Sequence, residues 1–562
     1  MDADASVSLA ERHRILALPP ERRAAAILAS ADAAALIRSL GPQDFYLSLV
    51  EADPDDALAL LAAARREQVD LVFDLDGWDG DEPAVERLGR WLGLLHQANP
   101  EQLVSWLLEA DEPTVVLVLS RLIHVYKLDE SSDPGFWPPE DREVPSLDGV
   151  YFLEPRDEAP EAAFPALWSA FALLRERARQ AYEALLEQVL WVIPAEQQEE
   201  AWERREARLA ERGFPPLEEA LEVWAPGHLE QAGVRAAIRE RLAALPRPAG
   251  AADAPPHDPP PLPAPLPPGE GALLAEGAGL LDERRRAAIA HALVRLGNRF
   301  AVASRDPLGD PETHAAGLRT ALSMVLLALD ELGAADAGAA ARALANIPTF
   351  ELCRIGVGAV RERVARAHRL ASGWLARVPH GRARLEVDLD EILAGLLAPR
   401  PGLPESGALR PPRARADLER VDRALDVIED LGRFVTGTLG LAGADRDLPE
   451  LDPLPARRER PDECLWSEIA LTALARRALG DPLRPAPLTR EQGRAALAAL
   501  LGDGAPPRRA TPRLFELARE AGLGEAATRH LADRLEHDAG DLSPAALPDT
   551  RFVRALLFRL SG

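Results

Sequence analysis

The stretch ADPDDALALL, residues 52–61, carries the pattern that decides the fold. Asp53 is a residue type that accepts hydrogen bonds from the free amides of a first helical turn. Pro54 suits the first helical position because its missing N–H would have no partner there. Asp55 and Asp56 then face the positive end of the helix dipole. Apolar side chains follow at helical spacing, so the stretch predicts a short amphipathic helix that begins at Pro54.

The same kind of helix start recurs along the first 126 residues. Asn99-Pro100 opens a similar stretch, and Gly41-Pro42 is a weaker copy. Short amphipathic helices in series cannot bury their apolar faces alone, so they stack on one another. We therefore expect a mainly α fold in which residues 1–126 form a superhelical, repeat-like domain of stacked short helices. The apolar ridges expected in its core are Leu58, Leu61, Ala62, Leu88, Trp91, Leu92, Leu95, Leu103, Trp106 and Leu107.

Changes in composition predict the remaining domains. Residues 127–165 are acidic and proline-rich, and Asp148-Gly149 before the β-favouring run 150–153 predicts one small β-hairpin. Helical spacing returns in a helical continuation at 166–245, with one long helix that ends before Pro194 and a charged helix that stops at Gly213. The other expected segments are a Pro-rich linker at 246–271, a second helical region that starts with a domain at 272–398, a linker at 399–416 and a C-terminal helical region at 417–562.

The composition limits the classes of partner. The formal net charge of −26 repels phosphate backbones and anionic membrane surfaces, so we expect no nucleic-acid partner. Apolar runs such as MVLLAL at 324–329 are much shorter than the ~20 residues of a membrane-spanning helix. Cys353 and Cys464 lie far apart, which fits a reducing cytoplasm. We expect a cytoplasmic protein that has a protein partner and no cofactor, and its oligomeric state stays open.

The stretch DLVFDLDGWDGDEP, residues 70–83, holds five aspartates around one tryptophan. A calcium-binding EF-hand loop that began at Asp74 would need Asp or Asn at its fifth position and Gly at its sixth, where Trp78 and Asp79 stand. The EF-hand template therefore fails. One interpretation is a turn between helices, in which Gly77 and Gly80 let the chain reverse, Trp78 packs between helices, and Asp79 or Asp81 caps the next helix. The alternative is a divalent-cation site built from Asp74, Asp76, Asp79 and Asp81, or a contact with a partner.

Other residues offer little chemistry. His530 and His537 lie ~10 Å apart along one predicted helix, which is too far for a shared metal. The chain contains no GxxxxGK[ST], HExxH, GxSxG or CxxC motif, so we assign no catalytic residue. The spacing of most tryptophans places them in helix cores. Trp137, in GFWPP, lies outside any predicted helix, and with Trp78 it is a candidate for contact with a partner.

Three stretches together resemble a known family. They are DLDGWDGD at 74–81, RLAERGFPPLEEALEVW at 208–224 and LVRLGNRFAVASRDPLGDPETHAAGLRTAL at 293–322. In this order they resemble a family of long bacterial proteins, common in delta-type proteobacteria and known only as a domain of unknown function. That resemblance implies no activity, cofactor or catalytic residue.

A second resemblance covers roughly residues 10–126. The phrases LPPERRAAAIL at 18–28 and ADPDDALALL are similar to the cytosolic superhelical domain of MgtE-type magnesium transporters. This similarity implies a superhelix of short helices.

These observations favour an interaction or scaffold protein, because the helical surface is repeat-like and no catalytic set is present. One alternative is an enzyme with an unrecognised, metal-dependent acidic site. Another, which the second resemblance implies, is a soluble sensor or regulator of divalent-cation handling.

Overall fold

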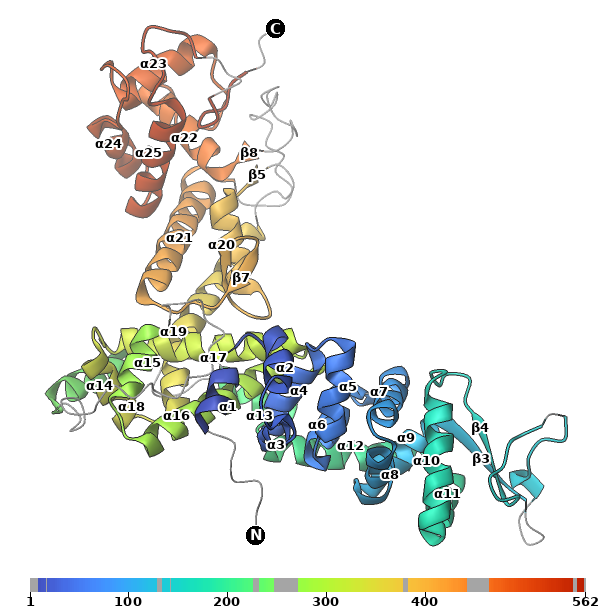
Figure 1. Cartoon of the computed structure of the whole chain (residues 1–562). Coiled ribbons are helices and arrows are strands. Elements are labelled where there is room, and N and C mark those ends of the chain that lie inside the picture. Colours follow the sequence, from blue (N-terminus) through green and yellow to red (C-terminus); the bar gives the residue numbers. More distant parts are fainter. Residues whose placement is uncertain are drawn as a thin grey trace. The chain divides into compact units, whose positions relative to one another are not determined.

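The computed structural model of the chain describes residues 9–16, 18–128, 134–141, 143–225, 232–246, 271–377, 383–441, 464–548 and 553–559. Within these residues the chain forms 25 α-helices and four two-stranded sheets, so the predicted mainly α fold is confirmed (Figure 1). In the same part of the chain, each helix is too short or too polar to cross a lipid bilayer. Cys353 and Cys464 are buried.

The chain divides into two compact units. Unit 1 contains Met1–Ala225, Arg241–Leu322 and Ala334–Glu351, and unit 2 contains Pro226–Glu240, Ser323–Gly333 and Leu352–Gly562. Helices α14 (Ala232–Ala244), α17 (Pro311–Glu331) and α19 (Thr349–Leu370) contribute residues to both units. The expected domain at 272–398 likewise contributes to both. Most of the expected linker at 246–271 lies outside the described residues, and the domain boundaries expected from composition stay predictions.

The other elements of unit 1 are mostly short helices. They are α1 (Leu9–Leu16), α2 (Pro20–Leu28), α3 (Ala33–Ser39), α4 (Pro42–Val50), α5 (Pro54–Ala63), α6 (Arg66–Asp76), β1 (Trp78–Asp79), β2 (Glu82–Pro83), α7 (Val85–Ala98), α8 (Pro100–Glu109), α9 (Glu112–Leu122), β3 (Ile123–Lys127), η1 (Pro134–Phe136), β4 (Tyr151–Pro155), α10 (Ala163–Arg177), α11 (Arg179–Leu190), α12 (Pro194–Glu211), α13 (Leu217–Leu221), η2 (Glu222–Trp224), α15 (Ala272–Gly279), α16 (Glu283–Ala303) and α18 (Ala337–Asn346).

Proline marks the helix starts as predicted. Helices α4, α5 and α8 begin at Pro42, Pro54 and Pro100. The Asn99 side chain accepts a hydrogen bond of 3.1 Å from the amide of Glu101. The side chain of Asp53 makes no such bond, so there the proline and the acids of the first turn mark the start without a side-chain cap.

The core of unit 1 follows the predicted ridges. Leu88, Trp91, Leu92 and Leu95 on α7 are buried, as are Leu103, Trp106 and Leu107 on α8. On α5 the buried pair is Leu60 and Leu61, while Leu58 and Ala62 are half-buried, so the buried face of this helix is turned slightly from the expected one. Each fully buried leucine contributes about 1.5–3 kcal/mol relative to an exposed one.

The expected long helix after residue 166 is two helices, so that prediction was wrong. Ala178 leaves the helical region at φ −144° and ψ 61°, which ends α10 and starts α11. The break lets α11 fold back on α10, and Tyr182 on α11 is buried edge-on against Phe171 on α10, with ring centres 6.2 Å apart. The next helix, α12, ends as predicted at Gly213, whose φ is +91°. The amides of Gly213 and Phe214 bond the last free carbonyls of the helix.

The predicted β-run near residue 150 is present as β4. Asp148 accepts hydrogen bonds of 2.9 Å from the amides of Val150 and Tyr151, which holds the turn in front of the strand. The main partner of β4 is β3, paired antiparallel from Ile123–Pro155 to Lys127–Tyr151. Before the turn, Ser146 forms a single antiparallel β-bridge with Phe152. Figure 1 shows β3 and β4 beside α10 and α11.

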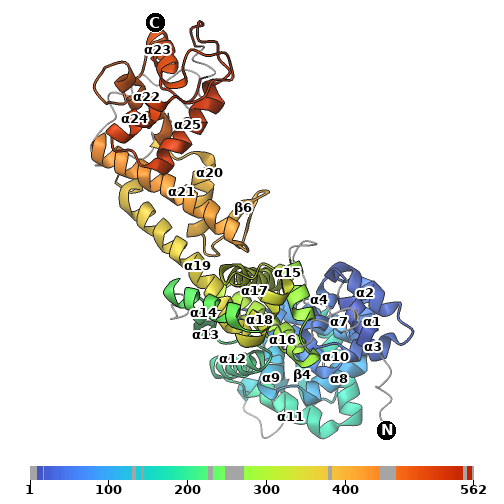
Figure 2. The same cartoon turned by 90° about the vertical axis from the view of Figure 1, so that its left-hand side faces the viewer.

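Unit 2 contains the C-terminal helices and four short strands that precede α22 in the chain. Its elements are η4 (Ala371–Leu375), β5 (Ala383–Arg384), α20 (Val387–Leu397), β6 (Leu403–Glu405), β7 (Ala408–Arg410), α21 (Arg415–Arg433), η5 (Phe434–Thr438), β8 (Cys464–Leu465), α22 (Trp466–Ala478), α23 (Arg490–Leu501), α24 (Pro512–Glu520) and α25 (Glu525–Ala539). Figure 2 shows α21, α22, α24 and α25 grouped together, and they share one apolar core.

Glycine residues explain two local features of unit 2, a hairpin turn and a close contact between helices. The proline-rich segment at 399–416 contains the hairpin β6–β7, whose turn residues Ser406 and Gly407 both have positive φ, the conformation that two-residue hairpin turns favour. Gly356 on α19 allows close packing, because a Cβ there would lie 2.1 Å from the carbonyl oxygen of Met324. Gly356 therefore serves the packing of α19 against α17.

Candidate functional site

The aspartate-rich stretch is a helix end followed by a tight hairpin. Helix α6 ends at Asp76, and β1 and β2 pair antiparallel around Gly80, whose φ is +66°. Residues 82–83 pair back onto 78–79, and the Asp79 carboxylate pairs with Arg87 in the first turn of α7. Ala84 occupies the cap position of α7 and no side chain caps it. The prediction that Asp79 or Asp81 caps this helix was therefore wrong.

Trp78 packs between helices, as the turn interpretation predicts. It is buried against Leu117 on α9 and Ala201 on α12. The guanidinium of Arg205 lies 5.3 Å from the centre of its ring, within the range of a cation–π contact. Trp78 is 6% exposed, so it offers a partner little surface.

Asp74 is buried and meets arginines from one face of α12. Its carboxylate lies 2.7 Å from Arg208 and 3.2 Å from Arg212, and its carbonyl oxygen accepts a 2.7 Å hydrogen bond from Arg205. Burial lowers the pKa of Arg208, but the hydrogen bond and charge of Asp74 outweigh it, so that pKa is raised. The buried carboxylate is thus fully compensated by guanidinium groups, as buried charges must be.

Asp76 faces a different set of donors. Its carboxylate accepts hydrogen bonds of 2.7 Å from the indole of Trp91 and 3.1 Å from Arg90. Arg87 donates to its carbonyl oxygen and also pairs with the exposed Asp79 at 2.6 Å. Asp81 is exposed, and its carbonyl oxygen accepts from Gln198 at 3.1 Å.

The four candidate metal ligands have different partners. Asp74 and Asp76 turn to separate arginine groups, and Asp79 and Asp81 are exposed in the hairpin. Among the described residues, no group of three or more His, Cys, Asp or Glu side chains is placed to hold a metal ion. A divalent-cation site at Asp74, Asp76, Asp79 and Asp81 stays a prediction.

The three stretches that carry the family resemblance meet inside unit 1. Asp74 joins the first stretch to the second through Arg208 and Arg212. Gly309 joins the third to the first, because a Cβ at Gly309 would lie 2.5 Å from the Asp76 carboxylate. The second and third stretches touch through Phe214 and His314, whose rings meet edge-on at 5.6 Å, and through Trp224 and Phe300 at 5.2 Å.

A buried polar group completes this meeting point. Asn298 and Gln43 exchange two hydrogen bonds, at 2.7 and 3.0 Å. His314 lies 3.4 Å from Gln43, its other ring nitrogen is 2.7 Å from the carbonyl oxygen of Leu308, and burial lowers its pKa. These bonds satisfy the group internally, which is typical of a buried network that fixes a fold.

A second candidate site lies at the surface, where α11 passes into α12. Trp191, at the end of α11, is 62% exposed, and Ile193 is 57% exposed. Phe136 lies 4.5 Å from Trp191 between ring centres, and its neighbour Trp137 is 42% exposed. We call Phe136, Trp137, Trp191 and Ile193 the Trp191 surface. Trp191 is not among the tryptophans of a helix core, because α11 ends at Leu190 and Pro194 begins a new helix.

Glu187 holds this surface in place. Its carboxylate accepts hydrogen bonds of 3.1 Å from the Trp191 indole and 2.5 Å from the Tyr151 hydroxyl, and it pairs at 2.5 Å with Lys127, the single lysine of the chain. Burial raises the pKa of Glu187, but the hydrogen bonds from Lys127, Tyr151 and Trp191 together outweigh it and lower that pKa. Trp191 is thus exposed and also fixed in orientation.

A groove of about 530 Å³ runs beside Trp191. The first turn of α9 forms one wall, through Asp111, Glu112 and Pro113, and α12 forms the other. The side chain of Gln197 on α12 bonds the carbonyl oxygen of Pro113 at 2.9 Å, which ties the two walls together. The groove joins an aromatic edge to acidic walls and is suited to a charged, partly apolar ligand.

A larger groove of about 630 Å³ lies between α7 and the start of α10. Its walls are largely apolar and include Pro160, Pro165 and Leu94. The arginines at its edge, Arg87 and Arg90, are paired with Asp76 and Asp79, so their charge is already balanced.

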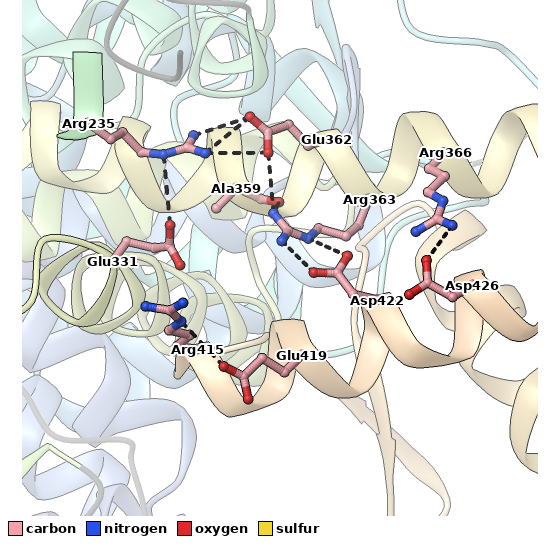
Figure 3. Close-up of polar contacts among 10 residues, drawn as sticks. All are labelled: Arg235, Glu331, Ala359, Glu362, Arg363, Arg366, Arg415, Glu419, Asp422 and Asp426. Carbon is pink, nitrogen blue, oxygen red and sulfur yellow. Dashed lines mark hydrogen bonds and ion pairs between the residues drawn. The ribbon is translucent and has the colours of Figure 1, made fainter. Parts of the chain in front are cut away.

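Unit 2 contains a ladder of ion pairs between α19 and α21 (Figure 3). Arg363 pairs with Asp422 at 2.6 Å, and Arg366 pairs with Asp426 at 2.6 Å. Arg235 on α14 extends the ladder to Glu362 at 3.3 Å and Glu331 at 3.8 Å. The pairs match cation to anion along two helices, which indicates a structural role.

His530 contributes to a second polar group in unit 2. Its ring nitrogen lies 3.3 Å from the buried carboxylate of Glu386, which Arg534 approaches at the same distance. The group stabilises α20 against α25, and within the described residues it is not part of a cluster of three metal-ligating side chains.

A model of the family of unknown function DUF6178 matches residues 3–559. The chain belongs to this family. The search of curated proteins and the search of solved structures find no match to the chain. Membership of DUF6178 covers all three stretches that meet around Asp74, Asp76 and Gly309.

Sequence reasoning missed the surface site. Trp137 was the only one of its aromatic residues singled out, and Trp191 and Glu187 were not. One local signal was present, because a tryptophan three residues before a helix-starting proline falls at a helix end. The acidic walls come from α9 and α12, which are separated by more than 70 residues of sequence, so no local pattern brings them together.

Proposed function

We propose that this protein is a helical interaction protein, a scaffold that holds a protein partner on the Trp191 surface. One observation carries the proposal: Trp191 is 62% exposed and yet is fixed by Glu187 and Phe136. Tryptophans that anchor interfaces lose a large apolar area to the partner. An anchor that is already ordered loses little entropy on binding, which favours affinity.

The wider features of the chain support this proposal. In the interior of unit 1, Asp74, Asp76 and Asn298 are paired with other side chains. The acidic composition argues against a nucleic-acid partner, and the two distant cysteines support a location in the reducing cytoplasm. We also propose that the short helices of residues 9–122 act as a repeat-like support for the site.

The two metal-based alternatives rest on less. A metal-dependent enzyme, or a regulator of divalent cations related to the superhelix of magnesium transporters, would use Asp74, Asp76, Asp79 and Asp81. Arginines already compensate Asp74 and Asp76. Both alternatives stay predictions, and thermal unfolding in the presence of divalent cations tests them.

Affinity capture of the tagged full chain from its native host, followed by mass spectrometry, tests the proposal. We expect a stoichiometric partner with the wild-type chain and its loss with Trp191→Ala. Trp202→Ala is the matched control, because Trp202 is 36% exposed on α12 and does not line the groove beside Trp191. Recovery of the same partner with Trp191→Ala, or of no partner at all, would contradict the proposal.

A further inference from the structure

We infer that the groove beside Trp191 binds a cationic segment of a partner protein, with arginine or lysine side chains next to an apolar one. The inference rests on the proposed function and deepens it, because it gives the chemistry of the partner. Both the aromatic edge and the acidic walls of the groove carry it.

The walls of the groove are acidic on both sides. Asp111 and Glu112 stand on α9, and Glu196 and Glu200 stand on α12. Among the described residues that line the groove, four are carboxylates and Arg204 is the one cationic side chain. A groove lined by one sign of charge between low-dielectric walls focuses its field on ligands of the opposite sign.

The existing partners of these carboxylates leave part of that charge unbalanced. Asp111 lies 3.2 Å from Arg208, and Arg208 already serves Asp74. Glu112 accepts a hydrogen bond of 2.8 Å from the neutral amide of Gln188. On α12, Glu200 lies 3.6 Å from Arg204. Glu196 is exposed and makes no hydrogen bond or ion pair within the described part of the chain.

The aromatic edge selects for an apolar or planar group beside the charge. Trp191 and Ile193 line the groove and are exposed, and Val116 and Val192 continue the apolar surface inside it. An arginine can stack on an indole ring and bond a carboxylate at the same time. A volume of about 530 Å³ is large enough for several side chains. The occupant that fits both features is a short basic segment with an apolar anchor.

The test uses the purified full chain and two dye-labelled synthetic peptides. One peptide alternates arginine with leucine, and the other has glutamate in place of arginine. Binding is followed by fluorescence anisotropy at two salt concentrations. Glu196→Lys/Glu200→Lys reverses the groove. Glu218→Lys/Glu222→Lys changes the net charge equally at exposed positions outside the groove, and melting curves confirm that both variants fold.

We expect the arginine peptide to bind and the glutamate peptide not to bind. The groove variant should weaken binding at least about tenfold, the control variant should stay within about twofold, and Trp191→Ala should also weaken binding about tenfold. Equal losses in the two double variants would show attraction to net charge alone and overturn the inference, as would preference for the glutamate peptide. If the arginine peptide fails to bind while the native partner is still captured and lost with Trp191→Ala, the inference fails and the proposed function stands.

Discussion

The indole nitrogen of Trp191 donates a hydrogen bond of 3.1 Å to Glu187, one helical turn earlier on α11. The bond places an exposed aromatic ring in a fixed orientation. Glu187 also receives Lys127 and Tyr151, so the end of α11 is joined to the β3–β4 sheet. The orientation of Trp191 thus depends, through the Glu187 carboxylate, on residues far from it in sequence.

Glu187→Gln should lower the free energy of unfolding, because it loosens the end of α11 from the β3–β4 sheet. It should also reduce the capture of the partner. The change removes the charge that pairs with Lys127, a half-buried pair worth about 1 kcal/mol of unfolding free energy at neutral pH. Because the folded pKa of Glu187 is lowered from 4.5, its contribution is present above the unfolded pKa and is lost as pH falls through the folded pKa. Urea unfolding of the two chains between pH 7 and pH 3 measures the difference, which should vanish at the acidic end. A difference that grows toward low pH would contradict this sign.

Asp74→Asn should destabilise unit 1 strongly. The change leaves Arg208 and Arg212 without their carboxylate, and breaking a buried ion pair from one side costs about 3–5 kcal/mol. Chemical denaturation of the full chain, followed by circular dichroism, measures the loss. Asp79→Asn is the matched control, since Asp79 is exposed and its pair with Arg87 is worth less than about 1 kcal/mol. Similar losses of unfolding free energy in the two variants would show that the buried ion pairs of Asp74 with Arg208 and Arg212 do not stabilise the fold.

Asp70→Asn should stabilise the chain at neutral pH. Burial raises the pKa of Asp70 from 3.8 to about 6, although Arg66 lowers it in part. Because the folded pKa lies above the unfolded one, this carboxyl group costs stability progressively as pH rises from about 4 to about 6. Asparagine removes a cost on the order of 1–2 kcal/mol above pH 6 and changes little below pH 4. Unfolding free energies of both chains across this range give the measurement, with Asp55→Asn on the exposed side of α5 as control. A stabilisation of Asp70→Asn that is constant with pH would refute the assignment.

Divalent cations should leave the melting temperature unchanged if the protein acts through its surface alone. A ligand at 100 times its Kd stabilises the folded state by about 2.7 kcal/mol. Thermal unfolding in the presence of Mg²⁺, Mn²⁺, Ca²⁺ or Zn²⁺ tests this expectation. A rise that disappears in Asp76→Asn/Asp79→Asn would favour the metal-dependent alternatives over the interaction protein.

The sequence predicted the local elements well and the long-range contacts poorly. Pro42, Pro54 and Pro100 fix helix starts because their effect acts on the first turn alone, and Gly213 ends a helix for a similar local reason. The break at Ala178 was missed, because alanine favours the helical conformation. The packing of Tyr182 on Phe171, which stabilises the break, is a tertiary contact that the local sequence does not show.

The candidate site was missed for the same reason. Periodicity assigns a side chain to a helix face but does not identify the neighbour of that face. Trp191 reads as a core residue until the end of α11 is known, and the contacts of Asp74 with Arg208 and of Asp76 with Gly309 join positions more than 130 residues apart. Such pairs leave no local pattern in one sequence.

Site-specific photo-crosslinking in the native host tests whether the Trp191 surface holds a protein partner. A photoreactive phenylalanine derivative replaces Trp191 in one chain and Trp202 in another, so that an aromatic ring is kept at each position. The account predicts one discrete crosslinked partner from position 191 and none from position 202. The same products from both positions, or no product from position 191, would contradict the claim that the Trp191 surface holds a protein partner.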